Sequence, residues 1–96
     1  MTLCWHPEAE AEFSDAVNYY DKCDEALGNR FLTLVEATVG RILCNPEISR
    51  CIYRECRGAK ASRFPYLIIY RMKNDMLQIV AVMHTSRRPG FWKNRL

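Results

Sequence analysis

The sequence predicts an α+β fold in the order β-α-α-β-β-β, with a helical hairpin packed on one face of a small antiparallel sheet. Three observations lead to this prediction. Apolar residues recur at helical spacing through residues 7–44. Asn45-Pro46 then ends that pattern, and segments rich in β-branched and aromatic residues follow it. At 96 residues the chain is expected to form one domain that spans residues 1–96.

The first two elements are a short strand and a long helix. Thr2–Trp5 is partly apolar and is expected to form an edge strand. Pro7 suits the first position of a helix, because its missing N–H has no partner there. Three glutamates between residues 8 and 12 follow where the helix dipole favours negative charge. The spacing of the apolar residues then predicts a helix over about 7–22.

A second helix is expected over about 25–44, with Asp24 as its N-terminal cap. Asn45-Pro46 ends it, because proline cannot continue a helix. The connection between the two helices is so short that they must lie antiparallel, as a hairpin. The residues that share one face of the second helix are Leu27, Phe31, Leu34, Val35, Thr38 and Ile42.

The strands of the second half form a predicted meander. Residues 57–63 read as a weak, polar strand, and 66–72 and 76–84 as stronger ones. Phe64-Pro65 and Lys73-Asn74-Asp75 supply the turns between them. The apolar faces of the helical hairpin are expected to cover one face of this sheet.

Charge is divided unevenly along the chain. Residues 1–48 carry nine acidic and three basic side chains, a net charge of −6, whereas residues 49–96 carry eleven basic and two acidic ones, +9. We expect the sheet face opposite the helices, with the arginine-rich tail 85–96, to stay open to an anionic partner such as RNA, DNA or an acidic protein segment. An ordinary solvated surface is the alternative.

Five cysteines, an odd number with no Cys-x-x-Cys spacing, predict free thiols in a reducing cytoplasm. Their spacing suggests no zinc site, and no other cofactor is implied. No stretch approaches the roughly 20 apolar residues that would span a membrane. The first residues also lack the basic and apolar regions of a signal peptide. A cytoplasmic protein without membrane association is therefore expected.

Six short sequence motifs along the chain match one protein family in their order and spacing. They are His6-Pro7-Glu8-Ala9-Glu10-Ala11-Glu12-Phe13, Asn18-Tyr19-Tyr20, Leu27-Gly28-x-Arg30-Phe31, Asn45-Pro46, Arg63-Phe64-Pro65-Tyr66-Leu67-Ile68-Ile69-Tyr70-Arg71 and Val82-Met83-His84-x-x-Arg87-Arg88-Pro89-x-x-Trp92. With them the chain resembles the RelE/ParE toxin superfamily, and most of all its plasmid-stabilisation, ParE-like branch. The resemblance covers essentially the whole chain.

The resemblance implies the toxin of a type II toxin–antitoxin module, which inhibits growth in the bacterial cytoplasm. A cognate antitoxin would neutralise it by wrapping it with an acidic, amphipathic segment, and operator DNA would be bound only through the antitoxin. A ParE-like toxin would poison DNA gyrase by protein contact. The alternative is a RelE-like mRNA endonuclease that cuts mRNA on the ribosome, so the resemblance leaves open whether the chain is an enzyme.

Candidate site residues follow from both functions. If the chain cleaves RNA, His84 would act as the acid or base, because histidine exchanges protons near neutral pH. Arg63 would then hold the phosphate with its guanidinium. Side chains expected to bind nucleic acid or the target protein are Lys60, Arg71, Arg87, Arg88 and Tyr66.

Each candidate also has a structural interpretation. Tyr66 and Tyr70 share one face of their strand, which is the core face in that interpretation. Arg71 then points to the opposite face. His84 would be a hydrogen-bonding group at a strand end, and Trp92 would clamp the tail against the sheet.

Overall fold

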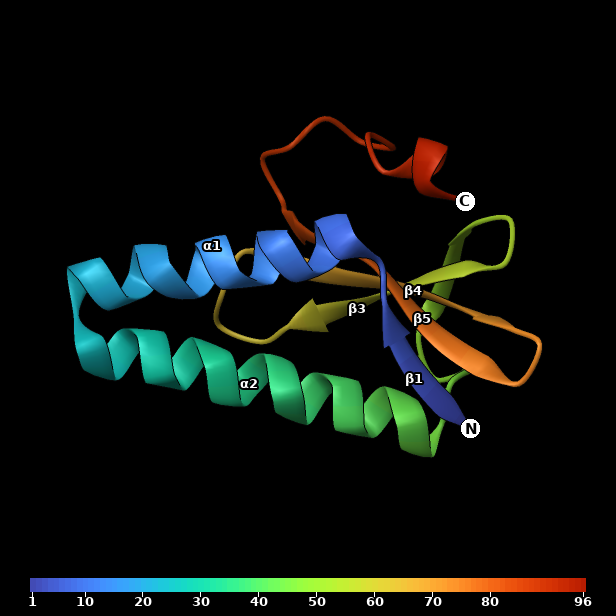
Figure 1. Ribbon diagram of the computed structural model, residues 1–96, viewed down its shortest axis with the longest axis horizontal. Coiled ribbons are helices and arrows are strands. Elements are labelled where there is room, and N and C mark those ends of the chain that lie inside the picture. Colours follow the sequence, from blue (N-terminus) through green and yellow to red (C-terminus); the bar gives the residue numbers. More distant parts are fainter.

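The computed structural model describes residues 1–96. Two helices, α1 (Pro7–Cys23) and α2 (Glu25–Cys44), form a hairpin that covers one face of a five-stranded sheet (Figure 1). The strands are β1 (Thr2–Trp5), β2 (Arg50–Tyr53), β3 (Cys56–Ala61), β4 (Tyr66–Lys73) and β5 (Met76–His84), and a 3-10 turn, Lys93–Arg95, follows. Neither helix is long and apolar enough to cross a lipid bilayer.

The sheet has the strand order β1-β5-β4-β3-β2. The strand pairs from β2 to β5 are antiparallel, whereas β1 runs parallel to β5 at the edge of the sheet. The α+β class, the element order and the helical hairpin are therefore confirmed. The structure adds the short strand β2, and the parallel pair makes the sheet mixed.

Both helix starts are capped by side chains. Nδ1 of His6 accepts the backbone N–H of Glu8 at 3.1 Å, and Oδ1 of Asp24 accepts that of Ala26 at 2.9 Å. Each bond satisfies an N–H that has no partner within its helix. The expected cap at Asp24 is confirmed.

Gly28 lets the two helices approach at the closed end of the hairpin. A Cβ built at Gly28 would lie 1.7 Å from Oδ1 and 3.0 Å from Cα of Asp21 in α1. A larger residue there requires the Asp21 side chain to move and its backbone to give way by a few tenths of an ångström.

The main core lies between the helices and the sheet. Tyr70 is fully buried in it, and its hydroxyl donates to the Pro46 carbonyl at 2.8 Å, so its polar end is satisfied. Tyr66 packs half-buried against the same core, which confirms the structural interpretation of both tyrosines. The other fully or nearly buried members include Ala9, Ala16, Phe31, Val35, Ile42, Ile68, Leu77, Ile79 and Val82.

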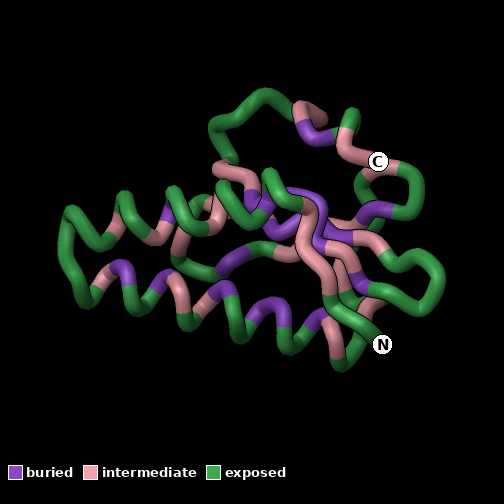
Figure 2. Tube along the Cα trace, viewed as in Figure 1, coloured by how far each residue is buried: buried purple, intermediate pink, exposed green.

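A second, smaller core lies on the opposite face of the sheet, under the C-terminal tail. Trp92, only 3% exposed, packs there with Cys56, Ile69, Val80 and Ala81. Figure 2 shows the exposed loop that precedes this buried segment. The expectation that this face stays open is therefore wrong, because the apolar tail covers it, and the clamping role of Trp92 is confirmed.

A β-bulge in β5 sets the direction of His84. Ile69 pairs with Ala81 but the next residue, Tyr70, pairs with Ile79, so Val80 is an extra residue. Strict alternation from Leu77 would turn His84 toward the tail. The bulge instead turns it toward α1.

Candidate functional site

Basic side chains in the second half of the chain differ in whether an acid neutralises them. Arg71 pairs with Glu55 at 3.1 Å and Arg95 with Glu12 at 2.7 Å, while Arg57 donates to backbone carbonyls. The other eight of the eleven are exposed and form no ion pair: Arg50, Arg54, Lys60, Arg63, Lys73, Arg87, Arg88 and Lys93. Cations without an acidic neighbour favour an anionic partner.

Three of the expected site residues meet at one end of the sheet. Tyr66 and His84 are direct partners in the β4–β5 pairing, and their rings pack edge-to-face with centroids 5.1 Å apart. Arg87 follows in the next turn and lines the same groove against α1. Burial raises the pKa of the Tyr66 hydroxyl above its ordinary value of 10.0. Tyr66 is therefore neutral at physiological pH, where it can stack or hydrogen-bond but not act as a base.

His84 is held by the residue two positions further on. Its Nδ1 accepts the backbone N–H of Ser86 at 3.0 Å and lies 2.8 Å from the Ser86 hydroxyl. In the neutral ring the nitrogen that accepts an N–H carries no proton, so the proton sits on Nε2. A neutral His84 therefore has Nε2–H as its remaining donor.

The groove around His84 has a volume of about 290 Å³. Besides His84, Tyr66 and Arg87, it is lined by two carboxylates of α1, those of Glu12 and Asp15. Glu12 is neutralised by Arg95, but Asp15 is exposed and forms no ion pair. The charge of Asp15 offsets that of Arg87, the one cation that lines the groove, so the groove has no net positive charge to attract a phosphodiester.

A cluster of aromatic rings lies near this groove. The ring centroid of Tyr20 is 5.0 Å from that of Phe64 and 6.3 Å from that of Tyr66. Phe31 contacts both rings as well. Phe64 and Arg63 line a different pocket, whereas Tyr66 lines the His84 groove. The structure thus places the two expected catalytic residues, Arg63 and His84, in different pockets.

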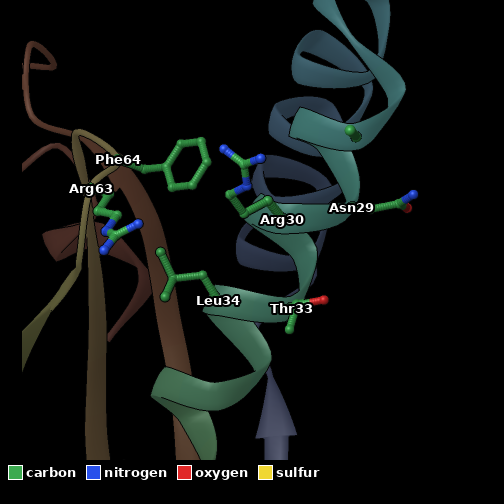
Figure 3. A pocket seen from close by; sticks show the side chains of 7 residues that line it. Asn29, Arg30, Thr33, Leu34, Arg63 and Phe64 are labelled. Atoms are coloured by element: carbon green, nitrogen blue, oxygen red, sulfur yellow. The ribbon is translucent and has the colours of Figure 1, made fainter.

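The pocket that contains Arg63 lies between α2 and the β3–β4 turn and has a volume of about 550 Å³. In Figure 3, Arg63 and Phe64 extend from the turn toward Arg30 and Leu34, which extend from α2 toward the turn. Arg30 was not among the residues expected from the sequence. In the sequence, the only indication of a role for Arg30 is that it belongs to the Leu27-Gly28-x-Arg30-Phe31 motif, which lies in the acidic half of the chain.

The remaining expected residues are dispersed. Lys60 lines a cavity between α2 and β3, and Arg88 is exposed in the tail loop. Arg71 lies on the tail side of the sheet, where Nε donates to Gln78 at 2.9 Å in addition to the Glu55 pair. Only Tyr66, His84 and Arg87 share a pocket.

No group of three or more His, Cys, Asp or Glu side chains is placed to hold a metal ion. All five cysteines are free, and burial raises the pKa of the Cys56 thiol above its ordinary 9.0. The pockets instead combine aromatic and apolar surface with a few charges, as binding surfaces for proteins do.

Comparisons with known proteins agree with the fold. The sequence profile of one family, described as the ParE toxin of the type II toxin–antitoxin system parDE, matches residues 3–89. A solved structure described as the chromosomal ParDE toxin–antitoxin system from P. aeruginosa superposes with a TM-score of 0.67. That match has 20% sequence identity and covers 88% of this chain and 95% of the other. No curated protein matches the sequence at a significant level.

Proposed function

The chain belongs to the ParE toxin family of type II toxin–antitoxin systems, and on that premise we propose that it poisons DNA gyrase by direct protein contact. A cognate antitoxin neutralises it, and operator DNA is bound only through that antitoxin. The toxin works in the cytoplasm, where gyrase acts. Lys60, Arg87, Arg88 and Tyr66 contribute to its surface for partners, whereas Arg71 is neutralised by Glu55 and contributes less.

The main support for this proposal is that Arg63 and His84 lie in different pockets. Cleavage of RNA by these two residues would require both to reach the same phosphodiester. They line two different pockets, which share no lining residue. The His84 groove also carries the free carboxylate of Asp15. Binding without chemistry fits these placements better than catalysis does.

A supercoiling assay tests the proposal. Purified protein is added to DNA gyrase, relaxed plasmid and ATP, and supercoiled product and cleaved DNA are separated on a gel. We expect supercoiling to be lost, with His84→Ala as inhibitory as wild type. Full supercoiling at a large excess of toxin would contradict gyrase poisoning.

A ribosome-dependent endonuclease remains the second candidate because one observation favours it. His84 keeps Nε2–H free beside Tyr66 and Arg87, which could donate a proton, stack on a base and contact a phosphate. Primer extension on mRNA from translating ribosomes decides between the two. Discrete cuts in the mRNA that disappear with His84→Ala would establish the endonuclease. An uncut mRNA would rule the endonuclease out.

A further inference from the structure

A group of exposed basic side chains lies where the C-terminal tail returns beside the β2–β3 turn (Figure 1). The two segments touch through Trp92 and Tyr53, whose ring centroids are 5.9 Å apart. Their one acidic side chain, Glu55, is already paired with Arg71. The basic side chains form no ion pair, and we call them the tail cations: Arg50, Arg54, Arg88 and Lys93.

The ring of Tyr53 positions two of the tail cations. Nζ of Lys93 lies 4.1 Å from the ring centroid, and the guanidinium carbon of Arg54 lies 5.1 Å from it. A ring face attracts a cation at such distances without neutralising its charge. Both charges are therefore in place before a partner arrives, and neither is cancelled.

Gly90 leaves room for the side chain of Lys93. The glycine has a φ of 79°, and its carbonyl accepts the Lys93 N–H at 3.0 Å. A Cβ built at Gly90 would lie only 2.9 Å from Cε of Lys93. A side chain at position 90 would therefore displace the lysine from its place over Tyr53.

Arg50 and Arg88 extend the same surface. Arg50 pairs directly with Gly58, so both residues point to the same side of the sheet. A Cβ built at Gly58 would lie 3.1 Å from the side chain of Leu67, which packs against the core under the tail. Arg88 accepts the backbone N–H of Phe91, where the buried part of the tail begins.

From these observations we propose that the tail cations bind the phosphate backbone of duplex DNA. The charges of Arg54 and Lys93 are at most 9.2 Å apart, since they lie 5.1 and 4.1 Å from one centroid. A duplex carries a negative charge about every 1.7 Å along its axis, so both cations can contact one duplex together. Phosphate contacts carry no sequence information, so recognition of an operator stays with the antitoxin.

The covered rings select a duplex over the other anionic partners. Single-stranded RNA is bound by stacking its bases on open aromatic rings, and an acidic protein segment needs an anchor for its apolar side chains. Tyr53 is half-buried under two cations, and Trp92 is only 3% exposed. A duplex keeps its bases inside and presents phosphates alone.

The biological role of this surface rests on the proposed function, because the duplex is then the DNA that gyrase holds. Four phosphate contacts bind free DNA weakly at physiological salt. A toxin that already touches gyrase meets the DNA at a high effective concentration, so the same contacts add to its affinity. The tail cations therefore strengthen inhibition by binding protein and DNA at once.

Anisotropy of a fluorescent duplex of about 20 base pairs, titrated with the protein at several salt concentrations, tests the proposal. The logarithm of the binding constant should fall with that of the salt concentration with a slope of about −3.6, or 0.9 for each cation. Arg54→Gln and Lys93→Gln should each flatten the slope by about 0.9 and weaken binding roughly 5- to 10-fold at 0.1 M salt.

Two control variants separate phosphate contact from net charge and from a fold defect. Lys22→Gln makes the same change in net charge in the last turn of α1 and should bind the duplex as wild type does. Arg54→Lys keeps the charge and should keep the slope. The proposal is overturned if the glutamine variants bind as wild type does, if Lys22→Gln weakens binding equally, or if single-stranded RNA or polyglutamate of equal charge binds more tightly than the duplex.

Gyrase supercoiling keeps failure of this inference distinct from failure of the proposed function. The double variant Arg54→Gln/Lys93→Gln should need a several-fold higher concentration than wild type for half-inhibition. If it loses duplex binding but inhibits gyrase as wild type does, the inference is wrong and gyrase poisoning stands. If wild type leaves gyrase active while duplex binding has the expected slope and depends on both cations, gyrase poisoning fails and the DNA-binding surface stands.

Discussion

Arg95, one residue from the C-terminus, forms a bidentate ion pair with Glu12 of α1, with nitrogen–oxygen distances of 3.0 and 2.7 Å. The Arg95 side chain is only 6% exposed. Arg95 also donates to the Val80 carbonyl, and Glu12 accepts the Val82 N–H. These backbone groups belong to the part of β5 that continues past its pairing with β1. The Arg95–Glu12 pair therefore satisfies backbone groups of β5 that a neighbouring strand would otherwise pair with. It also fixes the tail to α1.

Glu12→Gln should lower the free energy of unfolding by about 3 kcal/mol, because it leaves the buried guanidinium of Arg95 with only the exposed Glu8, 3.6 Å away, as a counter-charge. The hydrogen bonds that Arg95 donates to Glu12 raise the pKa of Arg95 above its ordinary value, and the guanidinium stays charged without them. Urea denaturation measures the change. Glu55→Gln is the control. The Glu55 side chain is 46% exposed in its ion pair with Arg71, so this substitution should lower the free energy of unfolding by less than about 1 kcal/mol. Equal effects of the two substitutions would contradict this account.

Gly28→Ala and Gly40→Ala should change stability in opposite directions. Alanine at Gly28 would displace the Asp21 side chain and crowd its backbone, at a cost of about 1–3 kcal/mol. At Gly40 nothing lies within 4 Å of the added Cβ, so helix propensity alone should raise stability by up to about 1 kcal/mol. Thermal unfolding of both variants checks the signs, and a stabilised Gly28→Ala would show that the close approach is not needed.

Arg63→Gly should preserve or raise stability, by up to about 1 kcal/mol, because it relieves the left-handed strain at φ 75°. Asp75→Gly, at φ 62° in the β4–β5 turn, tests the same strain at a second site and should be stabilised likewise. Chemical denaturation of both variants supplies the measurement. A destabilised Arg63→Gly would mean that the arginine supports the fold.

Stability should fall at alkaline pH through the buried Cys56 thiol. Its pKa is raised above 9.0, first by burial and then by the charge of Glu55. Above pH 9 the unfolded chain loses the thiol proton while the folded protein keeps it, so stability declines until the folded pKa is reached. Burial also raises the pKa values of the Tyr20 and Tyr66 hydroxyls. These two groups begin to add to the loss of stability near pH 10.

Cys56→Ala isolates this contribution to the pH dependence. It should flatten the decline that begins at pH 9, whereas Cys44→Ala, at an exposed position, should leave that decline unchanged. Denaturant midpoints between pH 7 and 10.5 supply the measurement. A decline that persists unchanged in Cys56→Ala would assign it to other groups.

Local patterns in the sequence predicted the helices closely. The second helix was placed at 25–44, as observed, and the first one residue short of Cys23. Strand β2 was missed, because its four residues are mostly exposed and its pairing with β3 shifts after Cys51. A short, exposed, irregular strand carries no alternation for a sequence pattern to detect.

Fold class and element order can be predicted from the sequence, because helix periodicity, caps such as Asp24 and turn residues act between positions a few residues apart. Which side chains share a pocket follows instead from the three-dimensional path of the chain. The Val80 bulge turned His84 toward α1, the hairpin brought Arg30 to Arg63, and the tail returned Arg95 to Glu12 across 83 residues. These contacts between residues distant in the sequence depend on strand register and on the tertiary fold, which no local pattern of residues encodes.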